Sequence, residues 1–183
     1  MRKVERSQVI DFQSYNDQRD SYRKHVLEEK SKRRIHLGEY LTFLFESNAT
    51  ILYQVQEMMR LEQIVREKDI QHEIDTYNAL LGGPGELGCT LLIEIDDADV
   101  RNEKLRAWLA LPAHLYLKLE DGSRAPAVWD SAQVDTRLSS VQYLKFKVGA
   151  RAPVAIGCDH PELSLESELT SDQRRTLAAD LES

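Results

Sequence analysis

The chain has 183 residues, of which 42% are hydrophobic and 30% are charged, as is ordinary for a soluble protein of one domain or two small ones. Its 31 acidic residues outnumber its 24 lysines and arginines and give a formal net charge of -7, which disfavours nucleic acid as the main partner. No apolar run reaches the roughly 20 residues that span a bilayer. The charged N-terminus lacks the apolar segment of a signal peptide, so we expect a cytoplasmic protein that does not enter a membrane.

The first half of the chain is predicted to be mainly helical. Sparse apolar positions among many charges indicate a solvent-exposed helix, and the alternating residues that precede an apolar run near Gly38 are typical of a hairpin. Ser47 or Asn48 is a good N-cap for the longest helix, and apolar residues at three- and four-residue spacing indicate one more. In chain order, these elements are expected over residues 18–33, 34–47, 48–67 and 69–81.

The stretch "GGPGELG", residues 82–88, is the strongest break in the sequence. It holds four of the eight glycines and is expected to separate a helical half from a sheet-rich half. A phosphate-binding loop typically continues into a helix, with a Lys and a Ser or Thr after its last glycine. Here Gly88 leads into "CTLLIEI", which is typical of a strand, so we do not expect a phosphate site in this loop.

The second half alternates between strands and helices. Period-two alternation and apolar runs predict strands within residues 89–95, 114–120, 125–130, 139–149, 152–161 and 162–169, and helices are expected over 97–111 and 171–181. The predicted fold class is α+β, with a helical N-terminal half packed on a mainly antiparallel β-sheet of about five or six strands. The expected regions are a helical region with a short hairpin over residues 1–83 and an antiparallel sheet with helices over 84–183, together one compact unit.

The longest predicted helix carries charged residues among its apolar ones. Helical geometry puts Glu62 and Arg66 into its apolar stripe, while Glu57 and Arg60 lie among apolar residues on the other side. Because a buried unpaired charge is costly, these side chains must be paired, hydrated or functional. One interpretation is pairing within the helix, and the other is a polar cleft between this helix and the next. The candidate ligand-binding residues are Gln56, Glu57, Arg60, Glu62, Arg66, Tyr77 and Asn78.

Such a cleft supports two functions, and the sequence leaves both open. The first is a non-enzymatic accessory or binding protein, whose cleft holds a small ligand or a side chain of a partner protein. The second is an enzyme in which Glu57 or Glu62 acts as a general base with its pKa raised by burial, while Arg60 holds a small anionic substrate. No residue is assigned a catalytic role, and a homo-oligomer is an open alternative.

Neither a metal site nor a cofactor is predicted. The Glu-x-x-His pairs of di-iron bundles and the Cys/His spacings of zinc sites are missing. Cys89 and Cys158 lack C-x-x-C spacing and are expected to be reduced core thiols. In "GCDHP", residues 157–161, Cys158 and His160 would share a strand face, but Asp before His-Pro is more typical of a turn.

The basic run "KSKRR", residues 30–34, is the other charged feature of note. It could hold an anion or an acidic partner, although a solvated charge cluster is the commoner outcome for such a run. It lacks interleaved aromatic residues, so nucleic-acid binding through it is the least favoured hypothesis.

Five segments of the chain resemble a bacterial family, the domain of unknown function 3501. These are "RRIHLGEYLTFLFE", "YQVQEMMRLEQI", "IDTYNALL", "CTLLIEI" and "IGCDHPEL", which together cover nearly all of the chain after about residue 20. The family pattern falls on Arg33, Arg34, Gln56, Glu57, Met58, Arg60, Glu62, Tyr77, Asn78, Asp159, His160 and Pro161. The chain departs from that pattern at "GELGCT", where the family has a proline-containing loop with a polar residue.

The resemblance implies no defined activity. Members are encoded beside rubrerythrin-like and iron–sulfur oxidoreductase-like proteins, which implies an accessory role in redox or oxidative-stress metabolism and a redox partner protein. A small anion is the other expected partner. The resemblance also adds Arg33, Arg34, Asp159 and His160 as secondary candidates beside the residues of the predicted cleft.

Overall fold

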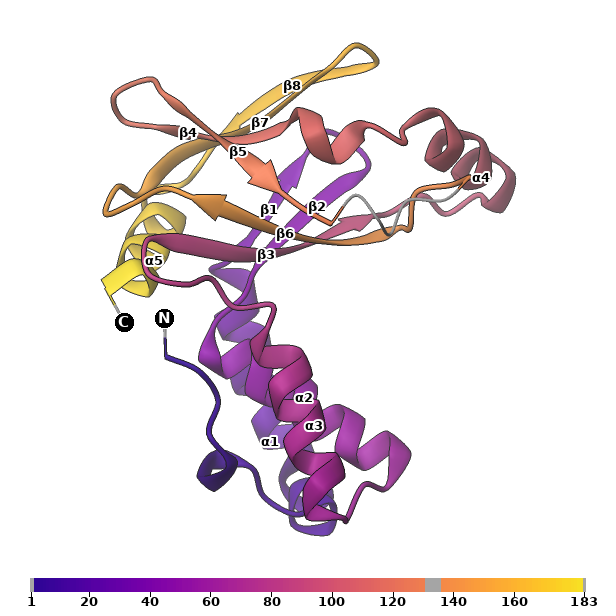
Figure 1. Ribbon diagram of the computed structural model, residues 1–183, viewed down its shortest axis with the longest axis vertical. Helices are drawn as coiled ribbons and strands as arrows, with labels where there is room; N and C mark the ends of the chain where they lie inside the picture. The colour runs from indigo at the N-terminus through magenta and orange to yellow at the C-terminus, as the bar shows by residue number, and fades with distance from the viewer. Residues whose placement is uncertain (1, 131–135, 183) are drawn as a thin grey trace.

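The protein has two lobes, a strongly curved β-sheet and a bundle of helices (Figure 1). The computed structural model describes residues 2–130 and 136–182. The helical lobe contains η1 (Arg6–Gln8), α1 (Phe12–Ser31), α2 (Asn48–Glu62) and α3 (Glu67–Asn78). Two further helices, α4 (Ala98–Ala107) and α5 (Ser171–Glu182), and the short η2 (Leu111–His114) lie around the sheet. No helix of the described residues is both long and apolar enough to cross a membrane.

Eight antiparallel strands form one sheet in the order β1-β2-β3-β6-β5-β4-β7-β8. Their bounds are β1 (Arg34–Leu37), β2 (Leu41–Phe45), β3 (Glu86–Ile93), β4 (Leu115–Leu119), β5 (Arg124–Val128), β6 (Val141–Lys147), β7 (Pro153–His160) and β8 (Leu163–Glu168). The sheet curls until its two end strands, β1 and β8, approach each other. A Cβ on Gly38, in the β1–β2 turn, would lie 2.5 Å from Leu165 Cδ1 on β8, so this glycine permits the approach. The result is a nearly closed barrel.

The expectation of a sheet of five or six strands is therefore wrong, although the α+β class is correct. The β1–β2 hairpin was expected in the helical region, whereas β2 pairs with β3 along its whole length, from Leu41 opposite Ile93 to Phe45 opposite Cys89. All five residues of β2 are buried. Such a strand needs a neighbour on each edge and a cover on each face, and an isolated hairpin provides neither.

The inward face of the barrel forms the larger of two hydrophobic cores. Alternate residues of β2, β3 and β6 point inward, and Trp108 and Leu177 close the barrel from α4 and α5. The second core lies inside the helical lobe, between α2, α3 and the N-terminal segment. Each lobe thus has its own apolar interior, and polar side chains concentrate where the two lobes meet.

The glycine-rich stretch forms the tight connection between these lobes. A Cβ on Gly88 would lie 2.0 Å from the carbonyl oxygen of Leu80, and one on Gly82 would lie 2.1 Å from the carbonyl oxygen of Glu86. Only glycine allows two backbone segments to approach this closely. The end of α3 is therefore held directly against the first half of β3.

A buried ion pair fixes α5 to the end of α1. Arg33 donates from Nε and Nη2 to the two carboxylate oxygens of Asp180, at 2.8 and 2.9 Å. Both side chains are about nine-tenths buried, and Glu29 adds a second carboxylate at 2.8 Å. Since α5 follows the last strand and Arg33 precedes the first, this pair fastens the two ends of the open sheet.

We predict that Asp180→Asn lowers the free energy of unfolding by roughly 3 kcal/mol, because it leaves the buried Arg33 guanidinium without its bidentate partner. Urea denaturation at pH 7 measures this effect. Asp172→Asn is the matched control, since Asp172 also lies on α5 and pairs with an arginine, but its side chain is 81% exposed. The control should leave stability almost unchanged. Equal, small losses in both variants would contradict a structural role for the Arg33–Asp180 pair.

Candidate functional site

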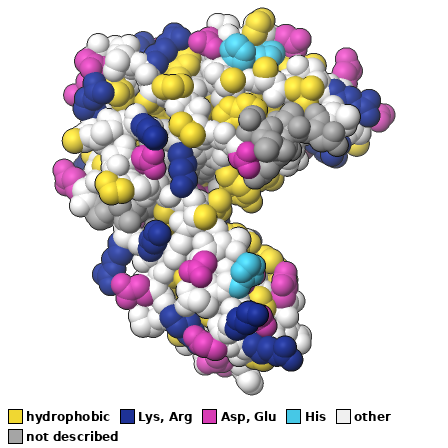
Figure 2. Space-filling view, viewed as in Figure 1, with side chains coloured by type: hydrophobic (Ala, Val, Ile, Leu, Met, Phe, Trp, Pro, Cys, Tyr) yellow, Lys and Arg dark blue, Asp and Glu magenta, His cyan; other side chains and the backbone are white. Residues whose placement is uncertain are grey.

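A cavity of about 270 Å³ lies where the outer face of the barrel meets the ends of three helices. This is the waist between the two lobes in Figure 2. Strands β2, β3 and β6 form one wall, α1, α2, α3 and the segment after α3 form the other, and β1 adds Arg34. The lining residues are Lys30, Arg34, Leu44, Glu46, Thr50, Ile51, Gln54, Tyr77, Leu80, Thr90, Leu92, Val141 and Tyr143.

The strand register builds the barrel wall of this cavity. Leu44 lies opposite Thr90, and Thr90 lies opposite Tyr143, so one row of outward side chains crosses three strands. The next row brings Leu92 beside Val141. Their inward-pointing neighbours fill the barrel core. The wall is consequently apolar except for one hydroxyl group on each of Thr90 and Tyr143.

Glu46 lies between the two walls and bonds to both. Its Oε1 accepts a 2.6 Å hydrogen bond from Thr90 on β3, and its Oε2 accepts one of 2.6 Å from Thr50 in the first turn of α2. The Glu46 backbone N–H donates to the carbonyl of Gly88 at 2.9 Å. Only 7% of Glu46 is exposed. A carboxylate at this depth is tolerated because hydroxyl groups from both lobes satisfy it.

Lys30 and Arg34 bring positive charge to the same cavity. The Lys30 ammonium is half-buried and lies 4.9 Å from the centre of the Tyr53 ring. No carboxylate of the described residues lies within ion-pairing distance of Lys30, although Glu46 is close enough to act on it electrostatically. Burial lowers the pKa of Lys30, the Glu46 carboxylate opposes this shift, and the Arg34 guanidinium adds to it.

Two tyrosines complete the polar groups of the cavity. Tyr143 is 49% exposed, and its pKa is raised by partial burial and by the proximity of Tyr77 and Glu46. The Tyr143 phenol is therefore a neutral hydroxyl group near pH 7, able to donate or accept a hydrogen bond, and Tyr77 adds a second hydroxyl group. The cavity thus offers two cations, one carboxylate, neutral hydroxyls and an apolar wall. This combination suits a small molecule with an anionic group and an apolar body.

The predicted cleft around Glu57 is instead an ion-paired contact between α1 and α2. Arg19 donates to both Glu57 oxygens, at 2.8 and 2.9 Å, and the buried Tyr15 hydroxyl donates at 2.6 Å. Arg60 reaches Glu57 only at 3.4 Å. The Arg19 interaction, against the cost of burial, holds the pKa of Glu57 at about 2. A general base needs its pKa raised toward neutrality, so the shift of Glu57 has the opposite direction.

Two other candidate residues fasten the N-terminal segment to the bundle. The Gln56 amide accepts from the Ile10 N–H at 2.8 Å and donates to the Ile10 carbonyl at 3.1 Å. Asn78 makes the same pair of bonds with Val4, at 2.8 and 2.9 Å. Each amide imitates a strand neighbour, and both are buried. These contacts give Gln56 and Asn78 a structural role that requires no ligand.

Glu62 and Arg66 do not lie in one helix, so the prediction that they pair across one helical turn is wrong. Helix α2 ends at Glu62, because Gln63 adopts a left-handed conformation with φ of 52°. Arg66 is the N-cap of α3. Both side chains are exposed, and no ion pair joins them within residues 2–130. Neither residue lines the cavity at the waist.

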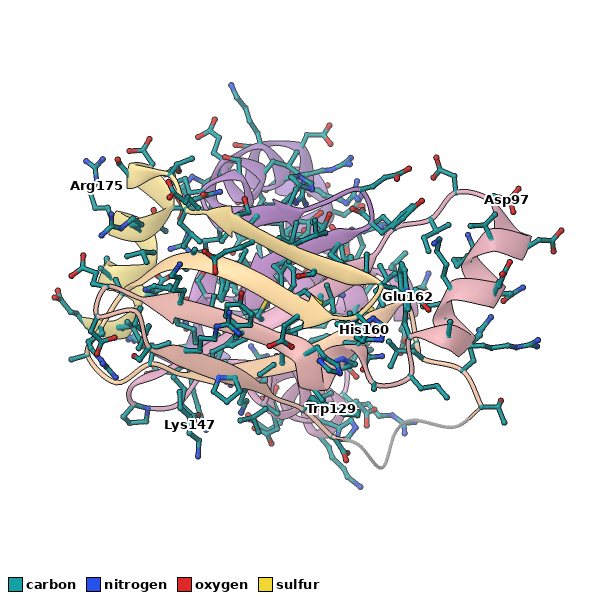
Figure 3. The ribbon with its side chains drawn as sticks, turned by 90° about the horizontal axis from the view of Figure 1, so that it is seen from above. Asp97, Trp129, Lys147, His160, Glu162 and Arg175 are labelled. Atoms are coloured by element: carbon teal, nitrogen blue, oxygen red, sulfur yellow. The ribbon has the colours of Figure 1, made fainter. Side chains whose placement is uncertain are left out.

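Of the candidate ligand-binding residues predicted from the sequence, Tyr77 alone lines this cavity. Of the secondary candidates, Arg34 alone lines it. Asp159 and His160 are the last two residues of β7, and His160 lies on the side of the barrel turned away from the bundle (Figures 1 and 3). Asp159 is exposed and pairs with Arg124 at 3.1 Å. His160 is buried, and its Nδ1 accepts a hydrogen bond from the Glu162 N–H at 3.3 Å. This bond lies in the turn between β7 and β8, where the sequence "GCDHP" predicted a turn.

The two thiols are both buried, and burial raises the pKa of each. Cys89 and Cys158 belong to the barrel core. In the part of the chain that the structure describes, no group of three or more His, Cys, Asp or Glu side chains is arranged to hold a metal ion.

The sequence analysis missed Glu46, Thr90 and Tyr143 as site residues. One signal for Glu46 was present, because it is a lone carboxylate between the mostly apolar β2 and the N-cap Ser47. Thr90 and Tyr143 carried no comparable signal. Their role follows from the pairing of β2, β3 and β6, which no local pattern specifies.

We predict that Glu57→Gln lowers the free energy of unfolding by roughly 2 kcal/mol at pH 7, because Arg19 and Tyr15 lose a charged acceptor. The folded-state pKa of about 2 lies below the ordinary value of 4.5, so this contribution is complete above about pH 5 and is lost as the pH falls toward 2. Urea denaturation at pH 7 and pH 3 should therefore show a smaller difference between the variant and wild type at pH 3. The exposed Glu62, changed to Gln, is the control. A difference that is the same at both pH values would contradict this account.

Comparison with known proteins finds one family model and a similar solved structure. The family described as "Protein of unknown function (DUF3501)" matches residues 3–181. No curated protein matches the chain. A solved structure described as a novel protein of unknown function from Burkholderia pseudomallei K96243 is similar, with a TM-score of 0.91 and 27% sequence identity over 98% of this chain and 100% of that one. The chain therefore belongs to the DUF3501 family.

Proposed function

We propose that this protein binds a small organic anion with an apolar body in the cavity between the barrel and the helical bundle. The observation that carries the proposal is the half-buried Lys30 ammonium, which lines the cavity with no carboxylate of the described residues in ion-pairing range. Partial burial of a charge without an ion partner costs stability. A bound anion would offset that cost by supplying the missing partner.

The other groups of the cavity restrict the shape of this ligand. Arg34 lines the same cavity and adds a forked donor suited to a carboxylate or phosphate. Leu92, Val141 and Tyr143 offer an apolar surface to the rest of the ligand. The Glu46 carboxylate favours a ligand with a hydrogen-bond donor on one side. The volume of about 270 Å³ lies just below the usual range for ligand pockets, which favours a small metabolite over a peptide or nucleic acid.

The alternative, an enzyme using Glu57 or Glu62 as a general base, has less support. Glu57 is an ion-paired carboxylate with a lowered pKa, and Glu62 is exposed beyond the cavity. Neither residue lines the cavity at the waist. The binding function is therefore the one that the geometry favours.

A cytoplasmic location and an accessory role in redox metabolism complete the proposal. The composition supports the first, and the resemblance discussed above supports the second. The two buried thiols have raised pKa values, which makes them poor nucleophiles. A redox role would therefore act through the bound anion or through a redox partner protein.

We predict that Lys30→Met abolishes stabilisation of the protein by small carboxylates, because the variant removes the ammonium group with which the ligand carboxylate would pair. The measurement is a thermal melt with a panel of aliphatic and aromatic carboxylates, in which wild type shows a rise in Tm that depends on ligand concentration. Without ligand, Lys30→Met should be as stable as wild type or more so, since the variant removes a partly desolvated charge.

Lys24→Met is the matched control, because Lys24 is exposed on the same helix and does not line the cavity. It should keep the full response to ligand. If no carboxylate or phosphate compound stabilises wild type, or if both variants respond as wild type does, the proposed site is wrong.

A further inference from the structure

The chemistry around Lys30 goes beyond attraction of an anion, and it suggests which class of anion the cavity takes. A lysine that pairs with a carboxylate is held as an ammonium and cannot act as a nucleophile. Lys30 lacks such a pair among the described residues, and its neighbours in the cavity include a second cation, Arg34. A lysine that is desolvated or placed beside another cation is activated as an amine nucleophile.

We propose that Lys30 forms a reversible imine with a small 2-oxo acid whose carboxylate is held by Arg34. This inference rests on the proposed function, since it names the class of anion that the same cavity binds. Lys30 and Arg34 are separate donors lining one cavity, so they can act on two adjacent groups of a single ligand. A carbonyl next to a carboxylate matches that arrangement.

The reaction needs no oxidant or reductant. The neutral Lys30 amine forms a C–N bond to the carbonyl carbon as the C=O π bond breaks, and one proton of the nitrogen passes to the oxygen to give a carbinolamine. The C–O bond then breaks, water leaves, and a C=N bond remains. Lys30 first loses its proton to solvent water, and Tyr77 and Tyr143 carry hydroxyl groups in the same cavity that can give a proton to the departing hydroxyl group.

The charges that face Lys30 act in both directions. Burial lowers its pKa, Glu46 and Glu57 raise it, and Arg34 lowers it again, with a net decrease. The amine is therefore available at a lower pH than in an exposed lysine. A carboxylate on the incoming ligand would neutralise Arg34 and favour the protonated imine once it has formed.

The experiment uses 4-methyl-2-oxopentanoate as the probe, because it joins a 2-oxo acid to a branched apolar body. The full-length protein is incubated with this probe and sodium cyanoborohydride, which reduces an imine to a stable secondary amine. Intact mass spectrometry and peptide mapping then locate the adduct. We expect one adduct, on Lys30, and its loss in Lys30→Arg, which keeps the positive charge. Lys24 and Lys32, both exposed, are internal controls for unspecific labelling.

The hydroxy acid with the same skeleton, 2-hydroxy-4-methylpentanoate, separates this inference from the proposed function. It can occupy the cavity but cannot form an imine, so it should suppress labelling of Lys30 in wild type, which tests the site without any variant. If both acids raise the Tm but Lys30 carries no adduct, the imine is refuted and anion binding stands. If neither acid raises the Tm and labelling is spread over the exposed lysines, both proposals are refuted.

Discussion

The bridge made by Glu46 is the interaction on which the relation of the two lobes depends. One carboxylate oxygen is bonded to Thr90 on the barrel and the other to Thr50 on α2, each at 2.6 Å. Each lobe has its own apolar core, so the hydrophobic effect alone does not specify how the lobes meet. A buried carboxylate that is hydrogen-bonded to both lobes specifies how they meet, because any other arrangement would leave the carboxylate without its partners. The cavity is a consequence of this contact, since polar side chains hold the lobes together without filling the space between them.

Charge is distributed unequally across this interface. Glu57 is neutralised by Arg19, and Arg33 is neutralised by Asp180. Lys30 differs, because it is half-buried and Glu46, the charged group that acts on it most strongly, is already hydrogen-bonded by two hydroxyl groups. A structural ion pair is accounted for by its contribution to stability, whereas a partly desolvated lysine without an ion pair lowers stability and needs another explanation. For this reason the cavity, and not the ion-paired helix contact, is the better candidate for function.

Local patterns predicted the elements well and the site poorly. The strand alternation, the N-cap predicted at Ser47 or Asn48 and the glycine break all depend on neighbours in sequence, and the structure has them, with Ser47 as the N-cap. The end of α2 was placed too late, because the left-handed turn at Gln63 has no glycine to mark it. The barrel was missed because β2 joins β3 across an intervening pair of helices. The cavity depends on that same pairing of β2 with β3. Glu57 stood out in the sequence because its position on a helix is a local property. Glu46 did not stand out, because its role depends on strands that are distant in the sequence.

The most direct test of the account is to see a ligand in the cavity. Crystals of the protein soaked with 4-bromobenzoate, a small carboxylate with a heavy atom on its apolar end, would be measured at the bromine absorption edge. The account predicts an anomalous peak against the wall of Leu92, Val141 and Tyr143, with the carboxylate directed toward Lys30 and Arg34. Bromine peaks confined to the outer surface of either lobe, with the cavity filled only by water at saturating ligand, would contradict it.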